Sequence, residues 1–271
     1  MGQLTANGMC YNEAKYGSLF KSHPAVKEVA MKQHMKRFFR HGMQFLVGAF
    51  VAAALIGAST AVYAASKEEA QALIDKSKGA LSDMLSDSAF SWLHSYLKTC
   101  NGVLIFPQVL KAGFFLGGSG GSGVLLVHDE KTGEWSQPAF YTLGSVTFGL
   151  QIGGEAAEVI MVAMNSKAID SLLSSSVKLG GDVSVTIGPV GGGAKGAVTV
   201  PEVTADFVSF TKTKGIYAGL NLEGSVLQVR DGLNGAYYGR EVMPKDILIR
   251  KEVGNSDANE LRSALHKASA R

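Results

Sequence analysis

The sequence is poor in the residues that usually hold metal ions, disulfide bonds and reactive centres. It contains only two cysteines in 271 residues, Cys10 and Cys100. Beyond residue 65 its histidines are His94, His128 and His266, and none has a histidine or cysteine at the spacing of zinc ligands. We therefore expect no metal site, no internal disulfide beyond residue 65, and an ordinary buried role for Cys100.

Two glycine-rich patterns match enzyme motifs but lack the context that those motifs need. Residues 118–123 fit G-x-G-x-x-G, and residues 117–121 fit G-x-S-x-G. Both motifs require a strand before the glycines and a helix after them, whereas an apolar, β-rich run follows here at 124–127. No arrangement of Asp, Glu or His supports hydrolysis, transfer or redox chemistry. The sequence therefore predicts no catalytic residues, no cofactor and no enzymatic activity.

Long apolar runs are also scarce, and the one that stands out has the form of a secretory signal peptide. Positive charges at 36–41 precede an apolar run at 45–58, and small residues follow at 62–64. The alternative is an uncleaved anchor, but the run falls short of the ~20 strongly apolar residues that a spanning helix needs. We expect a signal peptide over 35–64, cleavage near Ala64, and a periplasmic or secreted protein that is at most peripheral to a membrane.

Residues 1–34 fit no part of a signal peptide, because they are polar and show little apolar periodicity. We expect either that translation starts at Met31 or Met35, or that this extension is disordered. The remaining residues, 65–271, then form a single domain.

The basic charge of the sequence belongs mostly to its first 64 residues. The whole chain has 26 basic and 23 acidic residues, and residues 1–64 contain 7 and 2 of them. Residues 65–271 therefore keep 19 basic and 21 acidic residues, a net charge of −2. The overall basicity is thus no sign of nucleic-acid binding, and any anion-binding surface must be a local one.

The order of patterns beyond residue 65 predicts an α+β fold. Ser66 and Glu69 form a capping box that starts a helix, and a second helical stretch follows at 88–98. Short strands and glycine-rich turns then alternate, and Asp257 with Glu260 starts a final helix. This order predicts a Gly-rich, mainly antiparallel sheet, folded over or barrel-like, with helices at the N- and C-terminal ends.

Several boundaries follow from the same patterns. Pro107 is expected to end a strand at 103–106, and Asp231-Gly232 is expected to form a turn. Other strands are predicted at 182–187, 194–200, 206–212, 216–222 and 224–230.

Five lysines are candidates for a local anionic-lipid site, because they lie beside glycine clusters or share a strand face. The glycines allow tight turns and bulges, and exposed N–H groups in such loops would alternatively bind an anion. Ordinary surface solubility is the competing explanation for these charges. The candidates are Lys111, Lys178, Lys195, Lys212 and Lys214.

Four segments, in order, resemble the SYLF-domain family of lipid-binding proteins. They are residues 133–138, which follow the apolar run at 123–126, and residues 149–155, 178–182 and 214–225. The resemblance covers about residues 67–250, nearly the whole expected domain. The residues that carry the family signature are Gln151, Gly153, Gly154, Glu155, Gly215, Gly219, Glu223 and Gly224.

This resemblance implies a non-enzymatic module that docks anionic phospholipid headgroups as a peripheral membrane protein. Eukaryotic members bind phosphoinositides and some bind actin, often beside Src-homology or FYVE domains. In an exported bacterial member we expect no actin partner and no nucleic acid. The alternative is a structural or protein-interaction module of the cell envelope without a lipid site.

Overall fold

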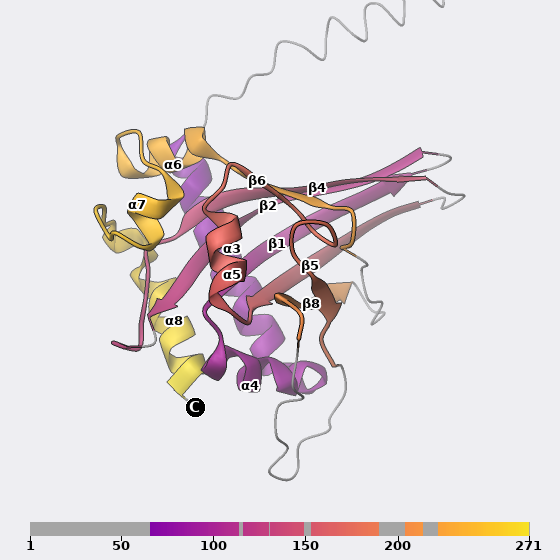
Figure 1. The fold of residues 1–271 in the computed structure, drawn as a ribbon, viewed down its shortest axis with the longest axis horizontal. Coiled ribbons are helices and arrows are strands. Elements are labelled where there is room, and N and C mark those ends of the chain that lie inside the picture. Colours follow the sequence, from indigo (N-terminus) through magenta and orange to yellow (C-terminus); the bar gives the residue numbers. More distant parts are fainter. Residues whose placement is uncertain are drawn as a thin grey trace, which may run out of the picture. The chain divides into compact units, whose positions relative to one another are not determined.

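A computed structural model describes the chain from the first predicted helix onward (Figure 1). The described residues are 66–113, 116–129, 131–148, 153–189, 204–213 and 222–270. They belong to one compact unit, Ala64–Arg271. The predicted signal peptide at 35–64 and the extension at 1–34 lie outside the described residues and stay predictions.

The centre of this unit is a nine-stranded sheet with the order β6-β9-β4-β2-β1-β5-β8-β7, in which β3 pairs with β2 off the main path. Every pair is antiparallel except β7–β8, so the predicted α+β fold with a mainly antiparallel sheet is confirmed. The strands are β1 (Gly102–Gly113), β2 (Leu116–Asp129), β3 (Glu134–Trp135), β4 (Ala139–Phe148), β5 (Gly153–Ala163), β6 (Ser176–Lys178), β7 (Val185–Ile187), β8 (Phe207–Thr213) and β9 (Val226–Val229).

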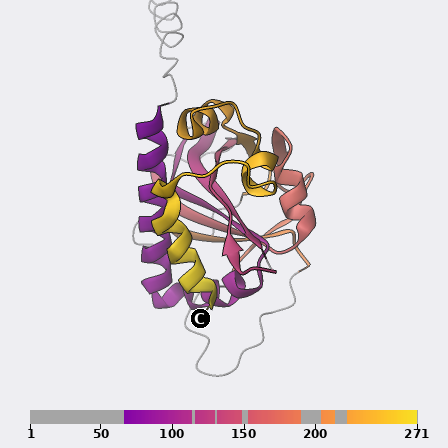
Figure 2. The same cartoon turned by 90° about the vertical axis from the view of Figure 1, so that its left-hand side faces the viewer.

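Helices cover both faces of this sheet. Figure 2 shows α3 (indigo) and α8 (yellow) on one side and α5 (salmon) on the other. The helical elements are α3 (Lys67–Ser86), η1 (Ser88–Phe90), α4 (Ser91–Thr99), α5 (Ser166–Leu172), α6 (Asp231–Tyr238), α7 (Pro244–Leu248), η2 (Ser256–Ala258) and α8 (Asn259–Ala270). The predicted helices at the two ends of the domain are therefore present.

The first helix, α3, begins where the sequence predicts it. The Ser66 Oγ accepts a hydrogen bond from the Glu69 N–H at 3.0 Å, which satisfies one of the free donors of the first turn. Apolar residues at helical spacing, such as Ile74 and Leu81, then face the sheet. The helix ends at Asp87, whose carboxylate accepts from the Ala89 N–H and starts η1.

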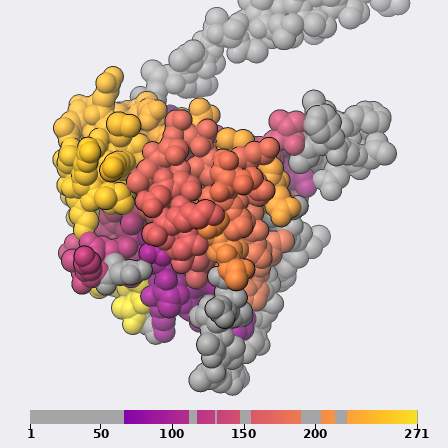
Figure 3. All heavy atoms as spheres, viewed as in Figure 1, coloured from indigo at the N-terminus to yellow at the C-terminus, as the bar shows by residue number. Residues whose placement is uncertain are grey.

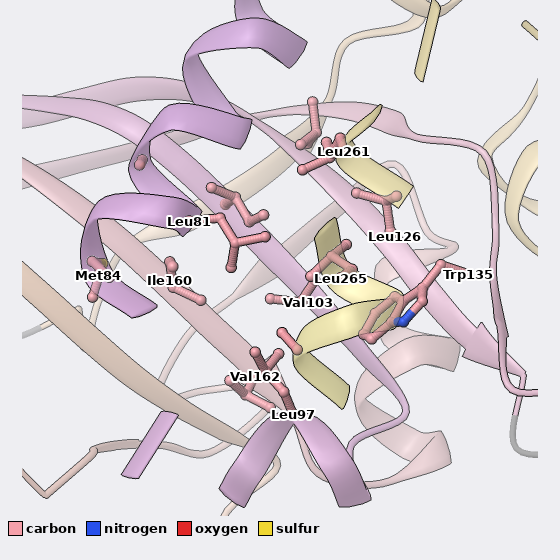
Figure 4. Close-up of a cluster of buried hydrophobic side chains, with 14 of the residues drawn as sticks. Leu81, Met84, Leu97, Val103, Leu126, Trp135, Ile160, Val162, Leu261 and Leu265 are labelled. Carbon is pink, nitrogen blue, oxygen red and sulfur yellow. The ribbon is translucent and has the colours of Figure 1, made fainter. Parts of the chain in front are cut away.

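Two hydrophobic cores lie on opposite faces of the sheet. The α3-side core packs Leu81, Leu97 and Leu265 from three helices against Val103 and Ile160 of the strands (Figure 4). The other core lies under α5 and α7 and includes Leu104, Phe106 and Leu172 among others. Because a fully buried aliphatic side chain contributes about 1.5–3 kcal/mol, both faces of the sheet stabilise the fold.

Strand β1 corrects the predicted boundary at Pro107. The strand continues through this proline to Gly113, because its register with β2 and β5 shifts between residues 105 and 110. A bulge of this kind tolerates the missing proline N–H. A Cβ on Gly121 would lie 2.3 Å from the Gln108 carbonyl oxygen, so this glycine, at a variable position of the G-x-G-x-x-G pattern, makes room for the bulge. The pattern is part of a strand and has no phosphate-binding context.

Two short helices after β9 were not predicted. Asp231 does not form the expected turn; it lies in the first turn of α6, which favours a negative charge, and that helix ends at Gly239 with φ 71°. Pro244 occupies the first position of α7, where its missing N–H costs nothing. The predicted strand at 182–187 is shorter, since β7 covers only Val185–Ile187. The predicted strand at 194–200 and residues 216–221 of the predicted strand at 216–222 lie outside the described residues.

Candidate functional site

One end of the sheet is left uncovered by the helices. The long strands β1, β2, β4 and β5 extend past the helices toward the right of Figure 1. Three aliphatic side chains at this end are exposed: Leu110 by 55 %, Val146 by 68 % and Val226 by 40 %. The middle of both sheet faces, in contrast, consists of buried apolar residues. An exposed apolar surface on an otherwise well-covered sheet is a candidate binding site.

The strand register places these three side chains on the same face. Leu110 lies opposite Gly120, Gly120 opposite Gly144, and Gly144 opposite Val226. In the next row Gly118 lies opposite Val146. Because side chains alternate along β2, this is the face of Val124 and Leu126, which is the α3 side. We call this surface the bare sheet face, and it consists of Leu110, Gly118, Gly120, Gly144, Val146 and Val226.

The beginning of α3 marks where the covered part of this face ends. The Arg230 guanidinium forms an ion pair with Glu69 of α3 at 2.8 Å and donates to the Ser122 hydroxyl at 3.1 Å. Ser122 lies on β2 two residues from Gly120, on the same side of the sheet. Through Arg230, the first turn of α3 thus contacts Ser122, which lies next to the bare sheet face.

Two glycines of the bare sheet face are not required by packing. A Cβ on Gly144 would meet nothing within 4 Å, and a Cβ on Gly120 would meet only the Leu143 carbonyl oxygen, at 3.6 Å. Gly123, on the opposite side of β2 from Gly120, has no such room, because a Cβ there would lie 2.4 Å from the Ile105 carbonyl oxygen. The glycines of the bare sheet face therefore keep the surface flat where larger residues would fit.

Two of the five candidate lysines lie at this end of the sheet. Lys178 is exposed on β6 and pairs with Val226 of β9, so it borders the bare sheet face. Lys111 follows Leu110 and points to the opposite side, in register with Ser119 and Glu155. The structure therefore brings Lys111 and Lys178 to one end of the sheet, but on different faces.

The other candidate lysines do not join them in the described residues. Lys212 lies on β8, where its ammonium forms an ion pair with Asp87 at 3.4 Å and its strand position faces Glu158 of β5. Burial raises the pKa of Glu158, the Asp83 carboxylate raises it further, and Lys212 opposes both effects. Lys195 and Lys214 lie outside the described residues.

The signature residues divide between this end of the sheet and the turn before β9. Gly153 and Gly154 begin β5, and Glu155 follows them opposite Lys111. Gly224 has φ 81°, which suits the turn that starts β9. Glu223 lies against Gly180, where a Cβ would approach within 3.3 Å of it. Gln151, Gly215 and Gly219 lie outside the described residues.

Sequence reasoning missed the three exposed aliphatic residues. Leu110, Val146 and Val226 each lie in a strand, where an apolar residue is normally expected to be buried. Their glycine neighbours in adjacent strands were the available signal, but the register that aligns them cannot be read without the strand pairing. Among the described residues, no cluster of three His, Cys, Asp or Glu could hold a metal ion. No helix in this part of the chain combines the length and apolarity needed to cross a membrane.

Comparison with known proteins assigns the fold to a family. Residues 144–268, from β4 to α8, match the family model described as Ysc84, a Las17-binding protein actin regulator. Residues 144–268 are a Ysc84-family domain by this match. This finding confirms the family resemblance of the sequence motifs.

Curated Ysc84-family relatives come from fungi and animals. The chain is 37 % identical over 149 residues to an SH3 domain-containing protein of Schizosaccharomyces pombe, which is 54 % of this chain and 34 % of the relative. It is 35 % identical over 155 residues to protein YSC84 of Saccharomyces cerevisiae, covering 56 % and 32 %. It is 30 % identical over 163 residues to human SH3 domain-containing YSC84-like protein 1, covering 60 % and 47 %. The chain thus spans about a third to a half of these relatives.

Proposed function

We propose that this Ysc84-family chain is a non-enzymatic, peripheral lipid-binding protein, and that the bare sheet face is the surface that enters the membrane. The observation that carries the proposal is the exposure of Leu110, Val146 and Val226 on one uncovered face of the sheet. Lys178 at the border would contact anionic phospholipid headgroups, whereas Lys111 points to the reverse side of the sheet. The signal-peptide pattern at 35–64 supports the further proposal that the protein acts in the periplasm or outside the cell.

The size of the surface fits weak, reversible membrane binding. A fully buried aliphatic side chain contributes about 1.5–3 kcal/mol, so three half-exposed ones would contribute roughly 3 kcal/mol on insertion. A lysine near an anionic surface adds about 1 kcal/mol. With Lys178, the total of roughly 4 kcal/mol corresponds to an affinity in the millimolar range. Such a surface would bind membranes peripherally and release them readily.

The same size argues against a stable protein interface at this surface. Three partly exposed aliphatic side chains make an apolar area on the order of a few hundred Å². A stable protein–protein interface buries about 800 Å² on each partner. A lipid surface places no such demand on area, because it surrounds each inserted side chain with hydrocarbon.

A second candidate function is a protein-interaction module without a lipid site. The family description, a Las17-binding protein actin regulator, favours it, because it names protein partners. In the exported protein that we propose, the partner would belong to the cell envelope and actin would be absent. Recovery of a specific protein partner by a chain that binds no vesicles would favour this candidate.

Vesicle co-sedimentation of the purified full chain tests the lipid proposal. We compare the wild type with the double variant Leu110→Asp, Val146→Asp on neutral and anionic vesicles. All variants share the same residues 1–65, so a difference in binding between them reports the bare sheet face. Met243→Asp is the matched control, since Met243 is 65 % exposed but lies at the start of α7. Asp is also favourable at such a helix N-cap.

The expected result is a loss of binding of about tenfold or more for the double variant, which corresponds to 1.4 kcal/mol or more. The Met243→Asp control should bind like the wild type. Lys178→Glu should weaken binding to anionic vesicles only, and added salt should weaken it in the same way. Unchanged binding by the double variant, or no binding of the wild type to either vesicle, would contradict the proposal.

A further inference from the structure

The bare sheet face is shallow and rigid, which restricts the membranes that it can enter. Its side chains project from strands in regular register, and glycines separate them. Leu110 and Val226 lie three strand spacings apart, a width of about 14 Å at ~4.8 Å per strand. Its described residues therefore meet a membrane as a flat plate with short aliphatic projections, and none of these six residues has a long side chain that could enter first.

The charges at this end of the sheet nearly cancel. Lys111 lies opposite Glu155 across the β1–β5 pair. Lys178 lies four residues from Asp182, whose carboxylate accepts a hydrogen bond from the Lys178 backbone N–H at 2.8 Å. Glu223 is exposed and lies against Gly180 of the same turn. Among the described residues at this end, two positive charges thus stand beside three negative ones. Attraction to anionic headgroups is accordingly small beside the apolar contribution.

We propose that the bare sheet face selects membranes by lipid packing: it binds where headgroups are spread apart, as on highly curved membranes or those rich in cone-shaped lipids. This inference rests on the proposed lipid-binding function. A flat plate about 14 Å wide must displace headgroups before its short side chains reach hydrocarbon. The gain of roughly 3 kcal/mol is small enough that the cost of opening a tightly packed bilayer cancels it. Loosely packed lipids already provide the gap.

The two unconstrained glycines provide a gain-of-function test. Gly120 and Gly144 both have room for a Cβ, and neither has a positive φ. The double variant Gly120→Val, Gly144→Val therefore adds apolar groups to the bare sheet face at two positions where a Cβ has room. It should bind large vesicles more strongly than the wild type does, and so discriminate less between vesicle sizes.

The deciding experiment measures binding of the full chain to phosphatidylcholine vesicles of two sizes at equal total lipid. Small sonicated vesicles have loosely packed outer leaflets, and large extruded vesicles are nearly flat. We expect about tenfold stronger binding to the small vesicles. Adding a cone-shaped lipid such as phosphatidylethanolamine to the large vesicles should recover much of that difference. The Leu110→Asp, Val146→Asp variant should bind both sizes equally weakly.

The possible failures are distinguishable. Equal wild-type binding to both sizes, with a loss in the Leu110→Asp, Val146→Asp variant, would overturn packing selection but keep the lipid-binding function. No binding to any vesicle would overturn both. Self-association of the wild type that this variant abolishes would instead identify the bare sheet face as an interface between two copies of the chain, and would also overturn both proposals.

Discussion

At the scale of single residues, Asp206 is a buried carboxylate that joins three segments. Its oxygens accept hydrogen bonds from the Ser184 N–H at 2.8 Å and from Asn165 at 3.1 Å, and Lys167 forms an ion pair with it at 3.0 Å. Burial raises its pKa, but the hydrogen bonds together outweigh burial and hold the pKa at about 2. Asp206 therefore fixes the beginnings of β7 and β8 beside the N-cap of α5.

Replacement of this carboxylate should destabilise the fold in a pH-dependent way. The folded pKa of Asp206 lies below its unfolded value of about 3.9, so its stabilisation is present above that pH and is lost as the pH falls toward 2. At pH 7, Asp206→Asn should lower the free energy of unfolding by about 2 kcal/mol. Urea denaturation at pH 7 and at low pH measures this difference. Asp170→Asn, at an exposed position of α5, should change stability by less than about 0.5 kcal/mol; an equal effect of both variants would contradict the role of Asp206.

Glu158 should show the opposite pH dependence. Its pKa is raised, mainly by burial, so the ionised form is disfavoured in the folded chain. Its contribution to stability is present at low pH and is lost as the pH rises through the folded pKa. Glu158→Gln should therefore raise the free energy of unfolding at pH 7, by less than about 1 kcal/mol because solvent screens the partly exposed carboxyl. The gain should vanish in acid, and a variant less stable than the wild type at pH 7 would disprove this account.

At the scale of elements, the glycines of β2 and β4 divide into those that the packing requires and those that it does not. Gly121→Ala would place a Cβ 2.3 Å from the Gln108 oxygen in the bulge of β1, so we expect a loss of about 1–3 kcal/mol. Gly144→Ala meets nothing within 4 Å and should be neutral or stabilise by up to about 1 kcal/mol. Thermal unfolding of the two variants makes the comparison. Equal destabilisation would show that the face around Gly144 is not open.

Elements with local signals were predictable, and those set by strand pairing were not. Ser66 indicated the start of α3 because its cap is a contact within one turn. Pro107 was expected to end β1, but the pairing of that strand on both sides absorbs the proline in a bulge. Asp231 was expected to form a turn, because an acidic residue before glycine fits a hairpin as well as a first helical turn. For Pro107 and Asp231, the surrounding fold and not the local sequence decided which structure forms.

At the scale of the whole molecule, the sheet is packed between helices over most of its length and is bare at one end. The middle of the α5 side is closed by α5 and the residues around it, shown in salmon in Figure 3. The sequence motifs identified the family and two lysines of this end, Lys111 and Lys178. They could not identify Leu110 or Val146, because exposure of a strand residue depends on where the helices stop. The candidate surface is thus a property of the assembled sheet.

The most direct test of the central claim asks whether Val146 enters lipid. A polarity-sensitive fluorophore on Val146→Cys reports insertion, and the same label on Ile187→Cys, 53 % exposed on β7, is the matched control. Cys10 is replaced by Ser, and Cys100 stays unlabelled because burial raises the pKa of its thiol to about 12. We predict that vesicles shift the emission of the Val146 label to the blue and leave the Ile187 label unchanged. A chain that sediments with vesicles while the Val146 label stays in water would contradict the account.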